Sequence, residues 1–256
     1  MATTLPLKGC GIVITRPTHQ AQHAEQQLIA AGAEVLKFPL LEITEPSNMA
    51  RCLEQLSALH SQDCVIFTSA NAVEYALAKL KAPLPTRCNI AAVGKKTAQA
   101  LATHGITATL VPQEKFNSEA LLALPELQNV TGQKISIIRG EGGRELLKET
   151  LSQRGAEVAY VDVYQRICPM ANLLPLVKFL DTQTLAIILL TSEESLLNLF
   201  DVTRGQTVLS HTTLLLGSPR IANSSVLAAY EGELLVASDP SDESIYKCLI
   251  SWANQK

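Results

Sequence analysis

The sequence predicts an α/β protein built of two similar lobes, each a parallel sheet flanked by helices. Short, continuously apolar segments alternate with amphipathic segments along the chain, a pattern typical of parallel sheets covered by helices on both faces. The 256 residues exceed one typical domain and suffice for two. A set of motifs also occurs twice at a constant separation, which indicates that one structural unit is used twice.

The repeat consists of four pairs of short motifs, and the members of every pair lie 123 residues apart. The pairs are IVITR (12–16) with ISIIR (135–139), GAEV (32–35) with GAEV (155–158), Thr68-Ser69 with Thr191-Ser192, and Gly94 with Gly217. Chance could supply one such match, but four in a single register predict two copies with equivalent loops. We therefore expect the functional site in a cleft between the copies.

Each copy opens with a strand followed by an amphipathic helix. The first strand is predicted at 12–15, and Thr18 is placed to cap the helix that follows. That helix carries an apolar stripe and ends at Gly32, as its counterpart ends at Gly155. The stripe residues are Ala21, Ala24, Leu28 and Ala31 in the first copy, and Leu146, Leu147 and Leu151 in the second.

The remaining strand–helix units also come in matched pairs. The predicted strands are 64–67 with 186–190, 90–93 with 214–216, and 109–111 with 234–236. The last two pairs precede helices beginning near Thr97 and Arg220, and near Ser118 and Asp242. The segments 35–43 and 158–167 differ, because each is extended with no helix directly after it. They are predicted to connect the lobes.

Composition excludes several classes of function. The net charge of −3 and the lack of a Lys/Arg block disfavour nucleic-acid binding. The chain shows no signal peptide and no apolar stretch of membrane-spanning length. Six scattered cysteines without a C-x-x-C pair indicate reduced thiols in the cytoplasm. His19 and His23 have i, i+4 spacing but no third ligand nearby, and RGEGGR (139–144) lacks the dinucleotide spacing, so neither a metal nor an organic cofactor is expected.

Candidate site residues follow the predicted strands, because parallel α/β sheets bind ligands at the carboxyl ends of their strands. These loops lead into helix N-termini, which favour anions. Serine and threonine there are also ordinary helix caps, so a purely structural role stays open for each loop. The second copy carries Glu193 and Glu194, which would repel an anion, so the first-copy loop is the better candidate. The candidate binding residues are Arg16, Thr68, Ser69, Ala70, Asn71, Gly94, Lys95, Lys96, Thr97, Arg139, Gly140, Gly142, Thr191, Ser192, Ser218 and Arg220.

Tyr164 is the candidate catalytic residue. It lies in the connector VDVYQR just after the second GAEV motif, where it is expected to face the cleft rather than the core of a lobe. Its hydroxyl could donate a proton to a leaving group. The alternative is that the ring simply packs on an apolar strand.

At these residues the chain resembles the uroporphyrinogen-III synthase family of tetrapyrrole biosynthesis. The resemblance covers nearly the whole chain, in the family's order and spacing, although each motif is weak by itself. The matching segments are VITRP (13–17), GAEVLKFPLLEI (32–43), VIFTSANAV (65–73), AAVGKKTAQAL (91–101), RGEGGRELL (139–147) and GAEVAYVDVYQR (155–166).

The resemblance implies a discontinuous lobe formed by 1–35 with 168–256, a second lobe at 43–158, and a two-stranded linker at 36–42 and 159–167. It implies a lyase that cyclises hydroxymethylbilane, a linear tetrapyrrole with eight carboxylates, to uroporphyrinogen III. The enzyme removes water and inverts ring D without a metal or organic cofactor. Tyr164 matches the family tyrosine proposed to assist departure of the hydroxyl.

The third loop departs from the family pattern G-P-T-T-A. It reads GKKTA at 94–98, so only Thr97 keeps a hydroxyl, and Lys96 is expected to substitute by charge. The second-copy loop GSPRIA (217–222) matches less well.

Two other classes of function remain open: a cofactor-free two-lobed binding protein for a polyanionic small molecule, and a nucleotide-sugar transferase. The expected setting is a cytoplasmic monomer with a transient contact to the enzyme that supplies its substrate.

Overall fold

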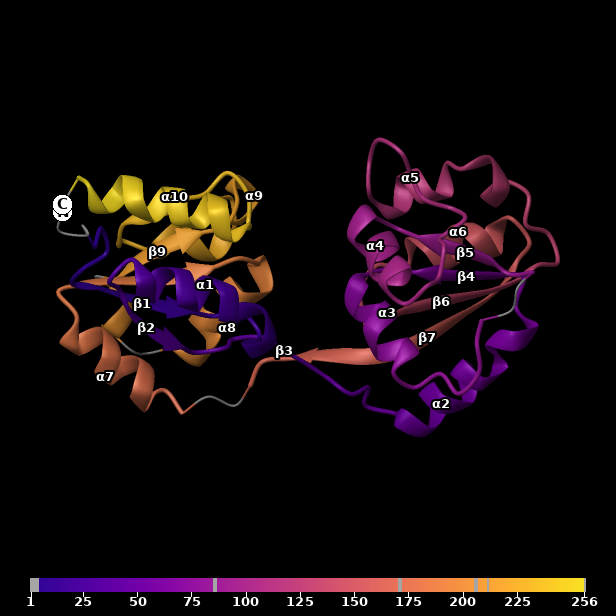
Figure 1. Cartoon of the computed structure of the whole chain (residues 1–256), viewed down its shortest axis with the longest axis horizontal. Coiled ribbons are helices and arrows are strands. Elements are labelled where there is room, and N and C mark those ends of the chain that lie inside the picture. Colours follow the sequence, from indigo (N-terminus) through magenta and orange to yellow (C-terminus); the bar gives the residue numbers. More distant parts are fainter. Residues whose placement is uncertain (1–4, 85–86, 170–171, 205–206, 211, 256) are drawn as a thin grey trace. The chain divides into compact units, whose positions relative to one another are not determined.

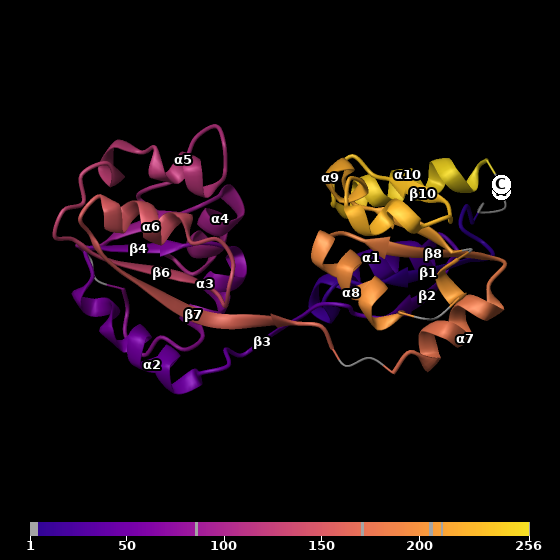
Figure 2. The ribbon, with the colours of Figure 1, turned by 180° about the vertical axis from the view of Figure 1, so that it is seen from behind.

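The computed structural model describes residues 5–84, 87–169, 172–204, 207–210 and 212–255. The chain forms two compact units, one made of Met1–Glu42 with Ile167–Lys256 and the other of Ile43–Arg166. Each unit contains one five-stranded sheet with helices on both of its faces (Figures 1 and 2). The predicted α/β class, with two parallel sheets flanked by helices, is confirmed.

The first unit joins segments from both ends of the chain in one parallel sheet. Its central strand β1 pairs with β2 on one side and with β8 on the other. The strand order is β10 (Leu234–Val236), β9 (Thr213–Leu216), β8 (Leu185–Leu190), β1 (Cys10–Ile14), β2 (Glu34–Lys37). The β1 and β9 residues are all buried, as expected for strands covered on both faces.

Two apolar cores sandwich this sheet. Helices α1 (Thr18–Ala30) and α10 (Asp242–Ala253) enclose one core, and α7 (Leu174–Thr182), α8 (Glu193–Val202) and α9 (Pro219–Ala222) enclose the other. The predicted stripe of Ala21, Ala24 and Leu28 faces the first core. Short 3-10 helices occupy Thr207–Leu209 and Ser225–Ala229.

The second unit has the same construction. Its strand order is β3 (Glu42–Thr44), β7 (Glu157–Ile167), β6 (Lys134–Gly140), β4 (Cys64–Phe67), β5 (Asn89–Ala92). Pairing from β7 through β6 and β4 to β5 is parallel. Helices α2 (Met49–Ser57), α3 (Ala70–Leu77) and α4 (Lys95–Thr103) pack around one core, and α5 (Ser118–Leu122) and α6 (Leu146–Gln153) around the other. Ala58–Ser61 and Pro125–Leu127 are 3-10 helices.

The two sequence copies are crossed between the units. A step of 123 residues takes β1, β2, β4 and β5 to β6, β7, β8 and β9. The first unit contains β1 and β2 of the first copy beside β8 and β9 of the second, and the second unit has the reverse combination. The orders β9-β8-β1-β2 and β5-β4-β6-β7 are therefore equivalent. Each unit is built from half of each copy.

Several local predictions were wrong. Pro17, not Thr18, is the N-cap of α1, and no side chain caps this helix. Helix α4 begins at Lys95 rather than near Thr97, because extended Gly94 already serves as its N-cap. The segment 109–111 forms only an isolated bridge from Leu110 to Ala91, whereas its counterpart forms β10. The predicted helix stops at Gly32 and Gly155 are confirmed, since both have positive φ, at 96° and 87°.

Candidate functional site

The predicted site residues gather in two groups, one at the carboxyl edge of each sheet. Parallel strands end at the same edge of a sheet, so the loops that follow them lie together. In the second unit these segments are 68–71 after β4, 94–97 after β5 and 139–142 at the end of β6. Residues 164–166 belong to strand β7 itself, near its end. In the first unit the corresponding segments contain Arg16, Thr191, Ser192, Ser218 and Arg220.

Tyr164 lies in the core of the second unit. It is 1% exposed and packs with Phe67 and Val163, so the expectation that it faces a cleft rather than a lobe core is wrong. The cause is local: the β6–β7 register shifts between Arg139 and Gly140, so that Gly140 pairs with Tyr164. The ring lies against Gly140, where an added Cβ would come within 2.4 Å of the ring Cε2. Gly140 thus makes the space that Tyr164 fills.

The Tyr164 hydroxyl is held by two polar side chains. Its oxygen lies 3.2 Å from Ser69 Oγ, and Arg166 Nη2 donates to it over 3.1 Å. The ring also contacts Tyr75, with 5.6 Å between ring centroids. Arg166 was absent from the sequence-based candidates. The signal that could have found it is its i+2 position on an extended strand, which places its side chain on the same face as Tyr164.

Ser69 connects this hydroxyl to the N-terminus of α3. It has extended backbone, and its Oγ accepts from the Ala72 N–H over 3.0 Å. Thr68 Oγ1 donates to the Ile138 carbonyl over 3.1 Å, which links the loop to β6. Ser69, Ala70 and Asn71 are all half-buried. The loop is therefore hydrogen-bonded to β6 and to the first turn of α3, and it is partly open to solvent.

The N-terminus of α4 combines two lysines with the absence of a cap side chain. Gly94 is its N-cap, Lys95 and Lys96 are exposed, and Thr97 is buried. Lys95 Nζ lies 4.8 Å from the centre of the Phe116 ring. Cations at a helix N-terminus oppose the helix dipole, so this segment lowers the stability of its own helix. Departures of this kind from local rules are characteristic of functional sites.

Arg139 and its repeat counterpart Arg16 are both paired with acids. Arg139 donates from Nε to Asp162 over 3.0 Å and from Nη1 to Glu145 over 3.1 Å. Burial alone would lower its pKa, but these bonds raise it. Arg16 donates to Asp242 and to the Thr191 hydroxyl. Both guanidinium charges are therefore compensated within their own units.

The carboxyl edge of the first unit is less suited to an anion. Ser192 Oγ caps α8 by accepting from the Ser195 N–H over 3.0 Å, and Glu193 and Glu194 occupy the first turn of that helix. Arg220 Nη1 lies 3.8 Å from Glu193 Oε2. Ser218 precedes the four-residue helix α9. Gly142, in the second unit, is exposed and has a φ of 74°.

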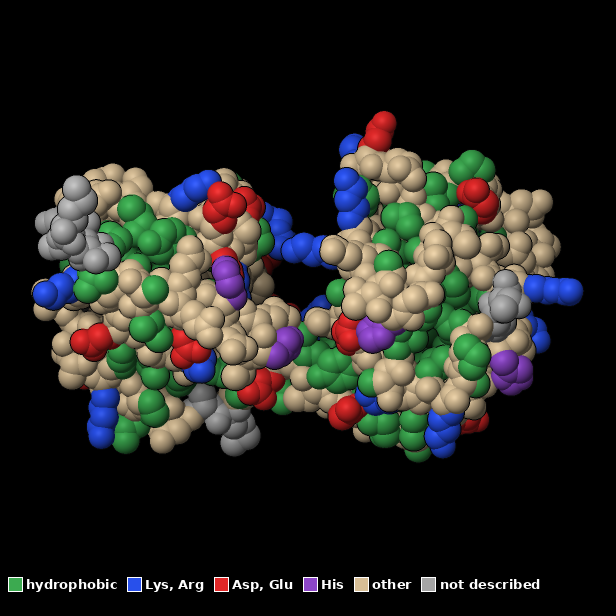
Figure 3. All heavy atoms as spheres, viewed as in Figure 1, with side chains coloured by type: hydrophobic (Ala, Val, Ile, Leu, Met, Phe, Trp, Pro, Cys, Tyr) green, Lys and Arg blue, Asp and Glu red, His purple; other side chains and the backbone are tan. Residues whose placement is uncertain are grey.

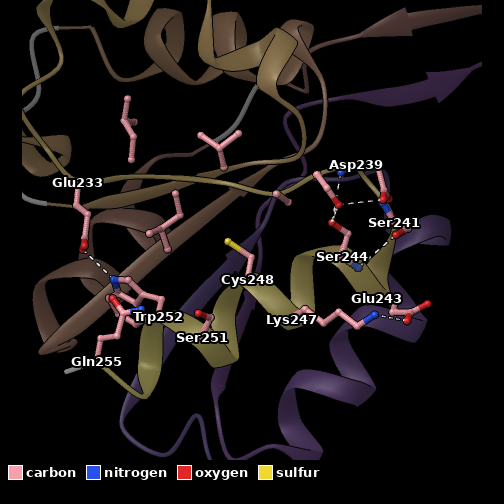
Figure 4. A pocket seen from close by; sticks show the side chains of 15 residues that line it. Glu233, Asp239, Ser241, Glu243, Ser244, Lys247, Cys248, Ser251, Trp252 and Gln255 are labelled. Carbon is pink, nitrogen blue, oxygen red and sulfur yellow. Dashed lines mark hydrogen bonds and ion pairs between the residues drawn. The ribbon is translucent and has the colours of Figure 1, made fainter.

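A hollow of about 670 Å³ lies elsewhere, between β10 and α10 (Figure 4). Three acids, Glu233, Asp239 and Glu243, line it, and its Lys247 is paired with Glu243 at 2.6 Å. This charge distribution disfavours a polycarboxylate. On the face drawn in Figure 3, acidic and basic side chains are interspersed over both units.

Within the part of the chain that the structure describes, two kinds of feature are absent, a metal-binding cluster and a membrane-spanning helix. Among the residues that the structure describes, no group of three or more His, Cys, Asp or Glu side chains is arranged to hold a metal ion. None of the helices in the described ranges has the length and apolar character needed to cross a bilayer.

The chain is similar to known proteins over most of its length. Residues 22–246 match the family described as Uroporphyrinogen-III synthase HemD. A uroporphyrinogen-III synthase of Escherichia coli (strain K12) is 38% identical over 158 residues, covering 60% of this chain and 64% of that protein. One from Synechococcus elongatus is 41% identical over 170 residues, covering 64% and 63%. The chain thus matches slightly under two thirds of the length of these relatives.

Solved structures show the same fold. A uroporphyrinogen III synthase from the extremely thermophilic bacterium Thermus thermophilus has a TM-score of 0.65 at 17% identity, covering 96% of this chain and 99% of that one. A uroporphyrinogen-III synthetase from Helicobacter pylori 26695 has a TM-score of 0.59 at 15% identity, covering 94% and 99%. The family match over residues 22–246 places the chain in the uroporphyrinogen-III synthase family.

Proposed function

We propose that this chain is a uroporphyrinogen-III synthase, a lyase that cyclises hydroxymethylbilane with inversion of ring D and loss of water. The observation that carries the proposal is the family match over residues 22–246. The product would enter heme biosynthesis.

The second unit supplies the chemistry that a polycarboxylate needs. Lys95 and Lys96 place two positive charges at the N-terminus of α4. The half-buried loop Ser69–Asn71 forms the N-terminus of α3. Helix N-termini offer free N–H groups and a positive partial charge. In this proposal both loops bind carboxylates, and Thr97 and Gly94 shape the second of them.

Arg16 and Arg139 have a different part in the proposal. Their charges are already met by Asp242 and by Asp162 with Glu145, so they hold the loops in position rather than supply the main binding charge. Thr68 acts in the same way through its bond to Ile138. Gly140, Gly142, Thr191, Ser192, Ser218 and Arg220 remain candidates for weaker substrate contacts.

The reaction needs acid assistance more than a strong nucleophile. The lone pair of a pyrrole nitrogen can expel the hydroxyl and leave an azafulvenium cation, provided that the departing oxygen is protonated. The protein then orients the substrate so that the substituted carbon of ring D attacks the cation, and orientation of this kind supplies much of the rate. Tyr164 and the side chains hydrogen-bonded to it, Ser69 and Arg166, supply the proton to the departing hydroxyl.

We further propose that the two units act as the two lobes, linked by 36–42 and 159–167. The enzyme would work as a cytoplasmic monomer that meets the enzyme producing its substrate only transiently.

The test is incubation with freshly prepared hydroxymethylbilane, followed by oxidation and separation of the porphyrin isomers. We expect the type III isomer to exceed a protein-free control by orders of magnitude. Type I product alone, at the spontaneous rate, would refute the proposal. Saturable binding of the bilane without type III product would favour a binding protein instead.

A further inference from the structure

This inference rests on the proposed synthase activity. We infer that Ser69 delivers the proton to the departing hydroxyl and that Tyr164 then resupplies Ser69 with a proton. Arg166 fixes the direction in which this proton relay runs. The three side chains form a continuous hydrogen-bonded series in the second unit.

The direction of the series follows from which groups can donate. An arginine guanidinium only donates, so Arg166 Nη2 occupies a lone pair of the Tyr164 oxygen. Tyr164 is 1% exposed, and its own proton would lack an acceptor, at a cost of about 1–3 kcal/mol, unless it is donated to Ser69 Oγ. The 3.2 Å separation allows that bond.

The Ser69 hydroxyl then has one hydrogen-bonding group left to use, its own O–H donor. Its Oγ accepts from Tyr164 and from the Ala72 N–H at 3.0 Å, which uses both lone pairs. The Ser69 proton must therefore point away from both partners. Ser69 is half-buried at the carboxyl edge of the sheet, whereas Tyr164 is enclosed in the core. Of the two hydroxyls, Ser69 is therefore the one that a substrate can reach.

The proposed step balances in protons and electrons. The pyrrole lone pair breaks the bond from carbon to the hydroxyl oxygen, while that oxygen takes the Ser69 proton and leaves as water. Ser69 Oγ takes the Tyr164 proton, and the phenolate formed stays bonded to the Arg166 guanidinium. The ring-D carbon that forms the closing bond loses its proton in that step, and this proton restores the neutral Ser69 and Tyr164 hydroxyls.

Comparison with the other copy of the repeat shows that the hydrogen-bonded series of Ser69, Tyr164 and Arg166 is specific to the second unit. Ser192 occupies the position equivalent to Ser69 and caps its helix in the same way, but its Oγ lies 2.8 Å from Ser195 Oγ. The positions equivalent to Tyr164 and Arg166 are Leu41 and Ile43. Helix capping alone therefore requires neither the tyrosine nor the arginine.

The experiment measures type III formation by Ser69→Ala, Tyr164→Phe and the double variant. We expect each single change to lower kcat by about 10²–10⁴-fold, with folding retained by circular dichroism. Because the two hydroxyls act in series, the double variant should be no slower than the slower single variant. Losses that multiply in the double variant, or an unchanged rate in Ser69→Ala, would overturn the inference.

Matched variants separate proton delivery from structure. Ser69→Asn keeps a good N-cap without an acidic hydroxyl and should be as slow as Ser69→Ala, whereas Ser69→Thr should recover most activity. Ser241→Ala removes a comparable cap, from α10, and Tyr230→Phe removes a phenol hydroxyl that donates to the Thr212 carbonyl in the other unit. Both controls should keep wild-type rates. Full activity in Ser69→Asn would contradict the assignment.

Arg166 is a positioning residue, and its test separates kcat from KM. Arg166→Leu should lower kcat at unchanged KM, and Arg166→Lys should recover part of it. In Ser69→Ala, type III formation should rise about tenfold per unit fall in pH, because solvent acid replaces the missing donor. A higher KM with unchanged kcat in Arg166→Leu would make Arg166 a carboxylate ligand instead. Wild-type protein that yields only type I product would refute the proposed function itself, which is a separate outcome.

Discussion

At the scale of single residues, the site depends on one glycine. Gly140 and Tyr164 are register partners across a β-irregularity, and the phenol ring occupies the volume that any side chain at 140 would need. The sequence contains both residues, but nothing in their spacing predicts the contact. It arises from a one-residue register shift that only the folded sheet defines.

Gly140→Ala should therefore displace the Tyr164 ring. We expect a loss of about 2–3 kcal/mol in unfolding free energy, typical of overpacking in a core, together with a large loss of type III formation. Urea unfolding and the isomer assay measure the two effects. Gly132→Ala is the control, since Gly132 has a φ of 76° and no atom within 4 Å of an added Cβ. It should cost about 1 kcal/mol through backbone strain alone. Normal activity in Gly140→Ala would contradict this account of the contact.

Asp242 makes stability depend on pH in the acid range. Burial raises its pKa, but hydrogen bonds from His23 and Arg16 outweigh burial, so the pKa is lowered overall. A lowered pKa in the folded state contributes stability above the ordinary value near 4, which is lost as pH falls through the folded value. We expect Asp242→Asn to lose about 2 kcal/mol at pH 7 and to show a smaller further loss below about pH 4 than the wild type. Urea unfolding at several pH values measures this, and parallel curves for the two proteins would exclude the Arg16–Asp242 pair as the cause.

At the scale of elements, the two copies of the repeat have diverged at their helix N-termini. Helix α8 begins with Glu193 and Glu194, which the helix dipole favours, where its counterpart α3 begins with Ala70 and Asn71. Helix α4 begins with Lys95 and Lys96, which oppose the dipole, where its counterpart segment has Ser218 and Pro219. The two acids stabilise α8. The two lysines destabilise α4, and in the proposed function they bind a carboxylate of the substrate.

Replacing both lysines by alanine should separate binding from stability. Lys95→Ala with Lys96→Ala should raise KM for the bilane about tenfold or more. It should leave the unfolding free energy unchanged or raise it by up to about 1 kcal/mol. The KM effect should shrink at high salt, because exposed charges are screened. Lys247→Ala is an exposed-lysine control in the other unit and should not change KM. An unaltered KM in the double variant would remove α4 from the binding site.

The helices and strands that could be predicted from the sequence are those that neighbouring residues determine. Apolar runs such as Cys64–Phe67 and glycine stops such as Gly32 and Gly155 depend on adjacent residues, and they were located correctly. The environment of Tyr164 depends on strand register, and that of Arg166 on strand pairing. Thr18 failed as a cap because Pro17 already has the extended backbone that an N-cap requires. Periodicity carries no information on such tertiary constraints.

At the scale of the whole molecule, the crossing of the copies leaves one unit continuous in sequence and the other made of two separate segments. The second unit is one continuous segment, 43–166, whereas the first needs β1 from the N-terminal region to pair with β8. Without 1–42, the largely buried strand β8 would lose β1, one of its two neighbours, and keep only β9.

The segment 43–166 should therefore fold by itself with a cooperative urea transition. The segment 167–256 should fold only when 1–42 is added, because β1 supplies buried residues such as Ile12 and Ile14 to its sheet. Mixing the two fragments should restore helical circular dichroism and a cooperative transition. Independent folding of 167–256 would contradict the crossed arrangement.

The most direct test of the function is the isomer ratio of the product made by the intact chain. Freshly prepared hydroxymethylbilane, consumed faster than it closes spontaneously, should give uroporphyrinogen III as nearly all of the product. A product that is entirely type I, formed no faster than in the absence of protein, would contradict the assignment of this family's activity to the chain.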